Sequence, residues 1–140
     1  MMSDREKGSC VCGSVSVEFN PSNVKAGVHC YCKNCQKLTG GGKSSNVLID
    51  QDKVALQGSL SKHGFKGDSG NQWTHVCCKE CGASIAMINE QEAEVVLRAG
   101  ILDDSSWVNF ISIFTRSATS WDLPSTEIQF EGAVPMHLRG

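Results

Sequence analysis

The chain has no apolar stretch approaching the ~20 residues that a membrane-spanning helix needs. It also lacks a basic excess, because 13 Lys and Arg stand against 15 Asp and Glu, for a formal net charge of −2. Nucleic-acid-binding surfaces normally carry such an excess. We therefore expect neither a membrane nor a nucleic-acid partner. The composition favours small molecules or other copies of the chain, as in a homo-oligomer.

A secretory signal is not recognisable at the start of the sequence, where residues 1–7 are charged and no apolar run follows them. The expected location is therefore the cytoplasm. Thiols stay reduced there, so clustered cysteines indicate metal ligands rather than disulfides.

Helical periodicity is scarce, whereas 14 glycines and many short apolar runs are typical of β-structure. The 140 residues are expected to form one mainly β domain with little helix. We expect one helical turn over 33–38, a loop or hairpin over 63–70 and a loop over 102–106. The expected strands are 14–19, 26–29, 46–50, 54–56, 72–76, 83–88, 94–99, 108–114 and 127–130.

Cysteine is the residue that the chain has in plenty, with eight in three tight groups. Neighbours two or three residues apart rarely meet disulfide geometry without strain. Such spacings suit thiolate clusters around a soft tetrahedral ion, for which zinc is the default. The groups are Cys10-x-Cys12, Cys30-x-Cys32-x-x-Cys35 and Cys77-Cys78-x-x-Cys81.

The pair Cys10 and Cys12 and the pair Cys78 and Cys81 together predict one closed site with four ligands. Four thiolates leave no position for a substrate, so this zinc site is expected to be structural. It would tie the start of the chain to its middle, and structural zinc contributes of the order of 10 kcal/mol in small peptides.

The middle group predicts a second zinc site with three ligands, Cys30, Cys32 and Cys35. Its open fourth position could accept and deprotonate a thiol substrate, or polarise a carbonyl as a Lewis acid. A second structural zinc and a metal-free reactive cluster remain alternatives. A protein group could also close the site, the candidates being His29, His75 and Cys77.

Cys77 and the remaining histidines have simpler interpretations. Cys77 is expected to be a buried strand thiol on the opposite face from Cys78, with a ligand or redox role as the alternative. His75 shares the face of Cys77, where it could shuttle protons, although a hydrogen-bonded histidine is favoured. His63 and His137 lie in polar segments and are expected to be exposed.

With the cysteines placed, residues 8 to about 132 resemble the glutathione-dependent formaldehyde-activating enzyme family, which also contains centromere protein V. The resemblance rests on the three groups, each in a motif, and on later segments in the same order. These are Gly-Ser-Cys10-Val-Cys12-Gly, Cys30-Tyr-Cys32-Lys-Asn-Cys35-Gln-Lys-Leu-Thr-Gly40, Cys78-Lys-Glu-Cys81-Gly, Arg98-Ala-Gly-Ile-Leu-Asp-Asp104, Ile113-Phe-Thr-Arg-Ser117 and Trp121.

This resemblance implies a zinc-bearing β-tent fold of packed antiparallel sheets over 8–132, with tails at 1–7 and 133–140. It implies two zinc ions per chain, one structural and one open to a thiol such as glutathione. The founding activity is formation of S-hydroxymethylglutathione from formaldehyde and glutathione, classed as a carbon–sulfur lyase. The resemblance thus makes Cys30, Cys32 and Cys35 both ligands and catalytic residues.

The chain departs from the family pattern at three places. Cys77 stands where an aromatic or other bulky residue is usual, and Ser112 stands where the strand before Phe114 usually carries a histidine. Gln36-Lys37 replaces the usual Arg-Lys pair. The loss of the histidine and the arginine removes possible anion or acid–base partners for glutathione.

The resulting hypothesis is a zinc-dependent, carbon–sulfur lyase-like enzyme that acts on glutathione or a related thiol and a small aldehyde. Cys35 is expected to be the most labile ligand, because a glycine-rich loop follows it. The alternatives are a non-enzymatic zinc-stabilised binding module of the centromere protein V type and a thiol or zinc sensor. The mildly acidic charge disfavours the first alternative.

Overall fold

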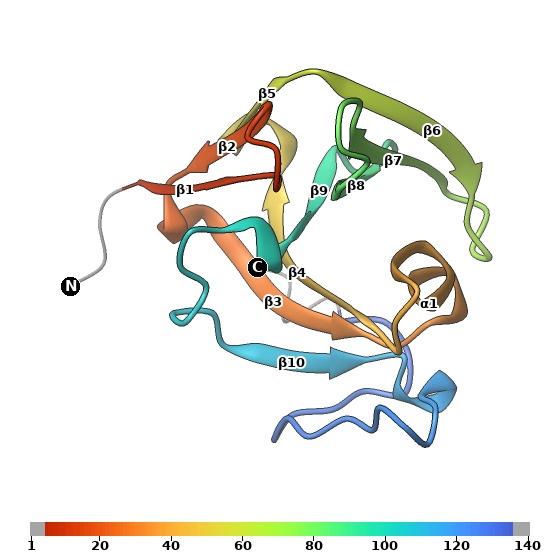
Figure 1. The fold of residues 1–140 in the computed structure, drawn as a ribbon. Coiled ribbons are helices and arrows are strands. Elements are labelled where there is room, and N and C mark those ends of the chain that lie inside the picture. Colours follow the sequence, from red (N-terminus) through yellow and green to blue (C-terminus); the bar gives the residue numbers. More distant parts are fainter. Residues whose placement is uncertain (1–4, 136–140) are drawn as a thin grey trace.

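The computed structural model describes residues 5–135, which form two packed β-sheets (Figure 1). The smaller sheet has the order β1-β2-β5, and its strands are β1 (Glu6–Ser9), β2 (Val15–Phe19) and β5 (Val54–Gly58). The larger sheet has the order β10-β3-β4-β9-β8-β7-β6. Its strands are β3 (Val24–Cys30), β4 (Ser44–Asp50), β6 (Leu60–Lys66), β7 (Gln72–Cys78), β8 (Ser84–Asn89), β9 (Glu94–Arg98) and β10 (Phe110–Ile113).

Helix is confined to short segments of the described chain. The α-helix, α1 (Lys33–Thr39), follows β3 and ends at Gly40, whose left-handed backbone (φ 75°) suits glycine. The single turns of 3₁₀-helix are η1 (Pro21–Asn23), η2 (Gln51–Lys53), η3 (Ala99–Ile101) and η4 (Thr115–Ser117). Within residues 5–135, no helix has the length and apolar character needed to cross a membrane.

The main core lies between the two sheets. Strand β2 supplies Val15, Val17 and Phe19, which are at most 2% exposed, because alternate residues of a strand point to the same face. The central strands β4, β8 and β9 are mostly buried on both faces, and besides apolar residues they bury polar ones such as Ser44, Asn46 and Arg98. A second, smaller apolar cluster on β3, β4 and β10 includes Val28, Leu48 and Ile113.

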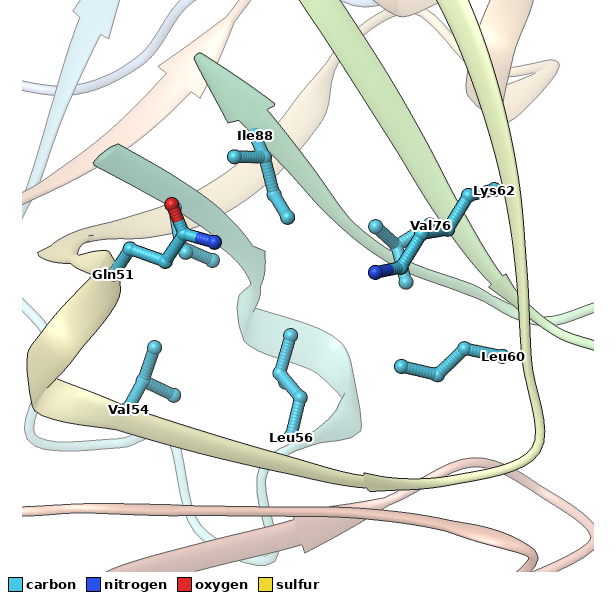
Figure 2. A pocket seen from close by; sticks show the side chains of 8 residues that line it. Gln51, Val54, Leu56, Leu60, Lys62, Val76 and Ile88 are labelled. Carbon is cyan, nitrogen blue, oxygen red and sulfur yellow. The ribbon is translucent and has the colours of Figure 1, made fainter. Parts of the chain in front are cut away.

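A cavity of about 230 Å³ opens beside this core, between β5 and the strands β6 to β9 (Figure 2). Its wall is mostly aliphatic, and none of the cysteines lines it. The lining residues are Gln51, Val54, Leu56, Leu60, Lys62, Val76, Ile88 and Val95. The cavity therefore lies apart from the cysteine groups.

The prediction of a mainly β fold is confirmed, with one pairing that differs from the antiparallel rule. Strand β10 pairs in parallel with β3, placing Ile113 beside Cys30. Strand β1 was not anticipated, and it takes in Glu6 and Lys7 from the expected N-terminal tail. The remaining pairings of the larger sheet, from β3 across to β6, are all antiparallel.

The expected loop or hairpin over 63–70 is a hairpin, in which β6 continues to Lys66 before the chain turns back into β7. Two other segment predictions need correction. Strand β10 is shorter than the expected 108–114. The segment 127–130 forms only an isolated bridge, between Gln129 and Ser112, instead of a strand. In these cases position in the sheet, at an edge or beyond it, outweighed local composition.

Candidate metal centres

The structure brings Cys10, Cys12, Cys78 and Cys81 together, with their Sγ atoms within 4.8 Å of one another. Two similar turns present them. The amide of Cys10 donates to the carbonyl of Val15 over 3.1 Å, and that of Cys78 donates to the carbonyl of Ala83 over 2.9 Å. Each turn contains a glycine with positive φ, Gly13 at 81° and Gly82 at 77°. Glycine is favoured there because a Cβ atom would strain this backbone.

Backbone amides surround the sulfurs of this four-cysteine cluster. The amide of Val15 donates to Cys10 Sγ over 3.3 Å, and the amide of Cys81 donates to Cys78 Sγ over 3.4 Å. Burial opposes ionisation of Cys10, but the Val15 amide and the neighbouring thiols lower its pKa to about 6. The Ser14 hydroxyl lies 3.1 Å from Cys78 Sγ and is the first cause of its lowered pKa. Four sulfurs with this support fit a closed tetrahedral zinc site.

The second group, Cys30, Cys32 and Cys35, also has its Sγ atoms within 4.8 Å of one another. Cys30 ends β3, Cys32 caps the N-terminus of α1, and Cys35 lies in the first turn of that helix. The amide of Cys35 donates to Cys32 Sγ over 3.4 Å. Cys30 is buried, whereas Cys32 and Cys35 are half-buried, so one side of this cysteine triplet is accessible.

The three thiols of the triplet differ in how readily they ionise. Hydrogen bonds from Cys30 and Cys35 lower the pKa of Cys32 to about 3. The bond with Cys30 lowers the pKa of Cys35, but the charge of Cys32 and burial raise it to about 11. The hydrogen bonds with Cys32 and Cys35 also raise the pKa of Cys30. A divalent ion would offset the repulsion between three ionised thiols. Three thiolate sulfurs fit zinc and leave one coordination position free.

The residues considered as a fourth ligand are absent from this group. Across residues 5–135, the triplet includes no further His, Cys, Asp or Glu. His29 Nδ1 instead lies 2.8 Å from Ser45 Oγ, and its ring stacks on Phe110 at a centroid distance of 4.1 Å. These contacts give His29 a structural role instead of a place at the metal site.

Cys77 and His75 share a strand face that is opposite to Cys78. Cys78 is buried in the main core, whereas Cys77 is only half-buried and its Sγ lies 3.6 Å from both ring nitrogens of His75. His75 Nε2 lies 2.8 Å from Ser84 Oγ, so this histidine is hydrogen-bonded. Burial raises the pKa of Cys77 and lowers that of His75.

The remaining residues singled out in the sequence have local partners. His63 Nε2 lies 2.9 Å from Ser61 Oγ on an exposed strand, whereas His137 lies outside the described residues. Gln36 Nε2 donates to the carbonyls of Tyr31 (2.9 Å) and Ser117 (3.0 Å) and so ties α1 to the η4 turn.

Ser112, at the position where the family usually has a histidine, is fully buried. Its Oγ lies 2.6 Å from Thr126 Oγ1. Like Gln36, it therefore has a structural contact of its own.

The burial of one charged residue, Arg98, was not anticipated from the sequence. Its side chain is only 6% exposed, although it was considered only as part of a motif. Nε donates to Ser84 Oγ over 3.0 Å and Nη1 donates to Asn46 Oδ1 over 2.7 Å, whereas Nη2 has no hydrogen-bond partner among residues 5–135. The available signal was a charged residue directly after the apolar run Val95-Val96-Leu97, within the expected strand 94–99.

Comparison with known proteins identifies the family to which this chain belongs. The family model described as glutathione-dependent formaldehyde-activating enzyme matches residues 5–117, which include all eight cysteines and Arg98. The chain belongs to this family. A comparison of this chain with curated proteins gives no match.

A crystal structure of a Rhodobacter sphaeroides protein, a structural genomics target, has a similar fold. The TM-score is 0.55 at 18% sequence identity, and the match covers 89% of this chain and 98% of the other. At this identity the likeness concerns the fold alone. Family membership and the two thiol clusters agree on a metal-binding protein related to glutathione and formaldehyde chemistry.

Proposed function

We propose that this protein is a zinc-dependent carbon–sulfur lyase that joins a thiol, such as glutathione, to a small aldehyde, such as formaldehyde, and reverses that reaction. The observation that carries the proposal is the contrast in ligand number between the clusters. Four cysteines complete one site, whereas three form the other, and a catalytic zinc site keeps one position for a substrate. Family membership supports the choice of thiol and aldehyde.

In this proposal both clusters hold zinc. Cys10, Cys12, Cys78 and Cys81 bind a structural ion, and Cys30, Cys32 and Cys35 bind a second ion and act as the catalytic residues. Zinc at the triplet would supply a positive centre that keeps a substrate thiol deprotonated at neutral pH. The proposal includes a reducing location such as the cytoplasm, because both sites need free thiols.

The protein residues around the triplet then have defined tasks. Cys30 anchors the site from the sheet, because it is buried at the end of β3. Cys35 lies on the short helix α1, where Thr39 Oγ1 donates to its carbonyl over 2.9 Å. Cys35 is the ligand proposed to be exchanged most readily, because α1 is followed directly by Gly40-Gly41-Gly42.

Exchange NMR on a mixture of glutathione and formaldehyde tests the proposal. Spectra are recorded without protein, with zinc-loaded wild type and with Cys35→Ser, because the reaction also proceeds unassisted. We expect faster exchange with the wild type alone. Exchange at the background rate in all three samples would contradict this activity and favour another adduct or a non-enzymatic role.

A further inference from the structure

Arg98 is a buried cation without a carboxylate partner. Its side chain is 6% exposed, and none of the ion pairs formed within residues 5–135 includes it. Burying an uncompensated charge is costly, so a buried guanidinium normally has an anion beside it. The compensating charge must therefore come from another group.

The cysteine triplet is the candidate source of this charge. On β4, Ser44 lies opposite Cys30 of β3, and Asn46 lies opposite Arg98 of β9. Ser44 and Asn46 are two residues apart and share a face of the sheet, which puts Arg98 on the face of Cys30. The guanidinium interacts electrostatically with Cys35 and Cys30 first, and also with Cys77 and Cys32.

The guanidinium is held firmly by its other two nitrogens. Nε donates to Ser84 Oγ and Nη1 to Asn46 Oδ1, while Asn46 Nδ2 donates to Ser44 Oγ over 2.9 Å. Asn46 and Ser44 are at most 2% exposed, so this network is rigid. The Nη2 group is left as a fixed, buried donor with no acceptor in the described part of the chain, an arrangement that costs free energy unless a ligand completes it.

We propose that Arg98 is a further catalytic residue, whose Nη2–H donates a hydrogen bond to the oxygen of the thiol–aldehyde adduct held at the triplet. This inference rests on the proposed function. The oxygen is the natural acceptor, because it lies only two bonds from the sulfur in any such adduct. The carboxylates of glutathione are many bonds away from that sulfur.

The step balances without an oxidant or reductant. The substrate sulfur, as a thiolate, forms a bond to the carbonyl carbon, and the carbonyl π-electron pair moves onto the oxygen. Nη2–H stabilises the resulting alkoxide, which then takes a proton from water. In the reverse direction the hydroxyl proton leaves to water and the carbon–sulfur bond breaks. A fixed donor aimed at developing charge is worth about 10²–10³-fold in rate.

The test uses Arg98→Lys, which keeps the charge but loses the planar fork, and Arg98→Met, which loses both. Glutathione–formaldehyde exchange is measured by NMR at saturating thiol. Thiol affinity is measured separately, by absorption titration of the cobalt-substituted proteins with glutathione alone. Arg5→Met is the control, because it removes a half-exposed arginine paired with Glu18.

We expect Arg98→Lys to slow exchange about 10²-fold while its affinity for glutathione stays within about threefold of wild type. Arg98→Met should be slowed at least as much, and Arg5→Met should match the wild type. Wild-type rates in both Arg98 variants would overturn the inference but leave the proposed function intact. Background rates in the wild type would remove both.

The alternative ligand is a carboxylate of the thiol substrate, and a second arm distinguishes it. The same variants are assayed with 2-mercaptoethanol, which has no carboxylate. A defect that persists with this thiol supports the adduct oxygen as the acceptor. A defect confined to glutathione, with affinity and rate lost together, would overturn the proposal in favour of carboxylate binding.

Ser84→Ala keeps the test decisive if the Arg98 variants do not fold, as judged by thermal unfolding. It removes the acceptor of Nε and leaves Nη2 present but less firmly held. We expect exchange to slow about threefold to tenfold with unchanged glutathione affinity. An unchanged rate in this variant, with unfolded Arg98 variants, would assign Arg98 a purely structural role.

Discussion

The two cysteine clusters use the same residue type in different surroundings. The four-cysteine cluster joins two tight turns at the edge of the main core, and neutral backbone amides donate to its sulfurs. The triplet lies on the other face of the larger sheet, beside the second apolar cluster and the buried cation of Arg98. In the proposed function, ligand number and neighbouring charge, rather than the thiols themselves, separate the stabilising site from the reactive one.

The charges also differ between the clusters. Zinc on four thiolates leaves two negative charges, and none of the ion pairs formed within residues 5–135 involves this site. Zinc on three thiolates would leave one negative charge, which the guanidinium of Arg98 would offset. An incoming thiolate and an adduct oxygen therefore meet a less negative site at the triplet, which favours the binding of anions there.

The largest expected effect is loss of stability on breaking the four-cysteine cluster. Cys12 is exposed, so Cys12→Ser removes a ligand with little loss of packing. Because structural zinc contributes of the order of 10 kcal/mol, we expect this variant to be largely unfolded or to melt far below the wild type. Thermal unfolding by circular dichroism measures it, with Cys77→Ser as the matched control. Equal melting of both variants would contradict a structural metal here.

The next effect is loss of one metal ion without loss of the fold. In Cys35→Ser the triplet keeps two thiolates, so we expect zinc per chain to fall from about two to about one, with exchange activity lost. Metal analysis and the NMR assay measure these outcomes. Melting should change much less than in Cys12→Ser, because the core between the sheets stays closed. Two zinc ions per Cys35→Ser chain would be the contrary result.

Acid should release metal from the triplet before the four-cysteine cluster. In the triplet the pKa of Cys32 is lowered, but metal binding must displace protons from Cys30 and Cys35, whose pKa values are raised, the second to about 11. In the four-cysteine cluster the pKa of Cys12 is raised, whereas those of Cys10 and Cys78 are lowered, the first to about 6. A raised pKa means tighter proton binding, so affinity at the triplet falls as pH falls, by about tenfold per pH unit for each displaced proton.

Metal content after equilibration at decreasing pH checks this order. Cys35→Ser isolates the four-cysteine cluster in the same measurement. Release of the first ion from the four-cysteine cluster would reverse the expected comparison.

The smallest effect concerns the turns that present the four cysteines. In Gly82→Ala the new Cβ atom meets no atom within 4 Å, but the φ of 77° strains an L-residue, so we expect a loss of about 1–2 kcal/mol. Gly100→Ala is the matched control, since it also meets nothing within 4 Å and has no positive φ. Denaturant unfolding measures both. Equal stability of the two variants would remove the argument from backbone strain.

Much of the fold was predictable where local pattern and position in the sheet agree. The alternating segment 14–19 became β2, and the apolar segments 83–88 and 94–99 became β8 and β9. The cysteine spacings anticipated which thiols would meet, because each group is local or pairs with a turn of the same kind. Prediction was less successful at the edge of the sheet. Strand β6 is half exposed and polar, so its strand character comes from its pairing with β7.

The sequence by itself determined the kind of protein: a mainly β chain of a thiol-rich, metal-binding family, with one complete cluster and one incomplete cluster. It did so because ligand chemistry depends on residue type and short spacing. Only the tertiary structure decided which charge faces the incomplete cluster. Arg98 and Asn46 are 52 residues apart and meet through the β4–β9 register, an interaction that no local pattern encodes.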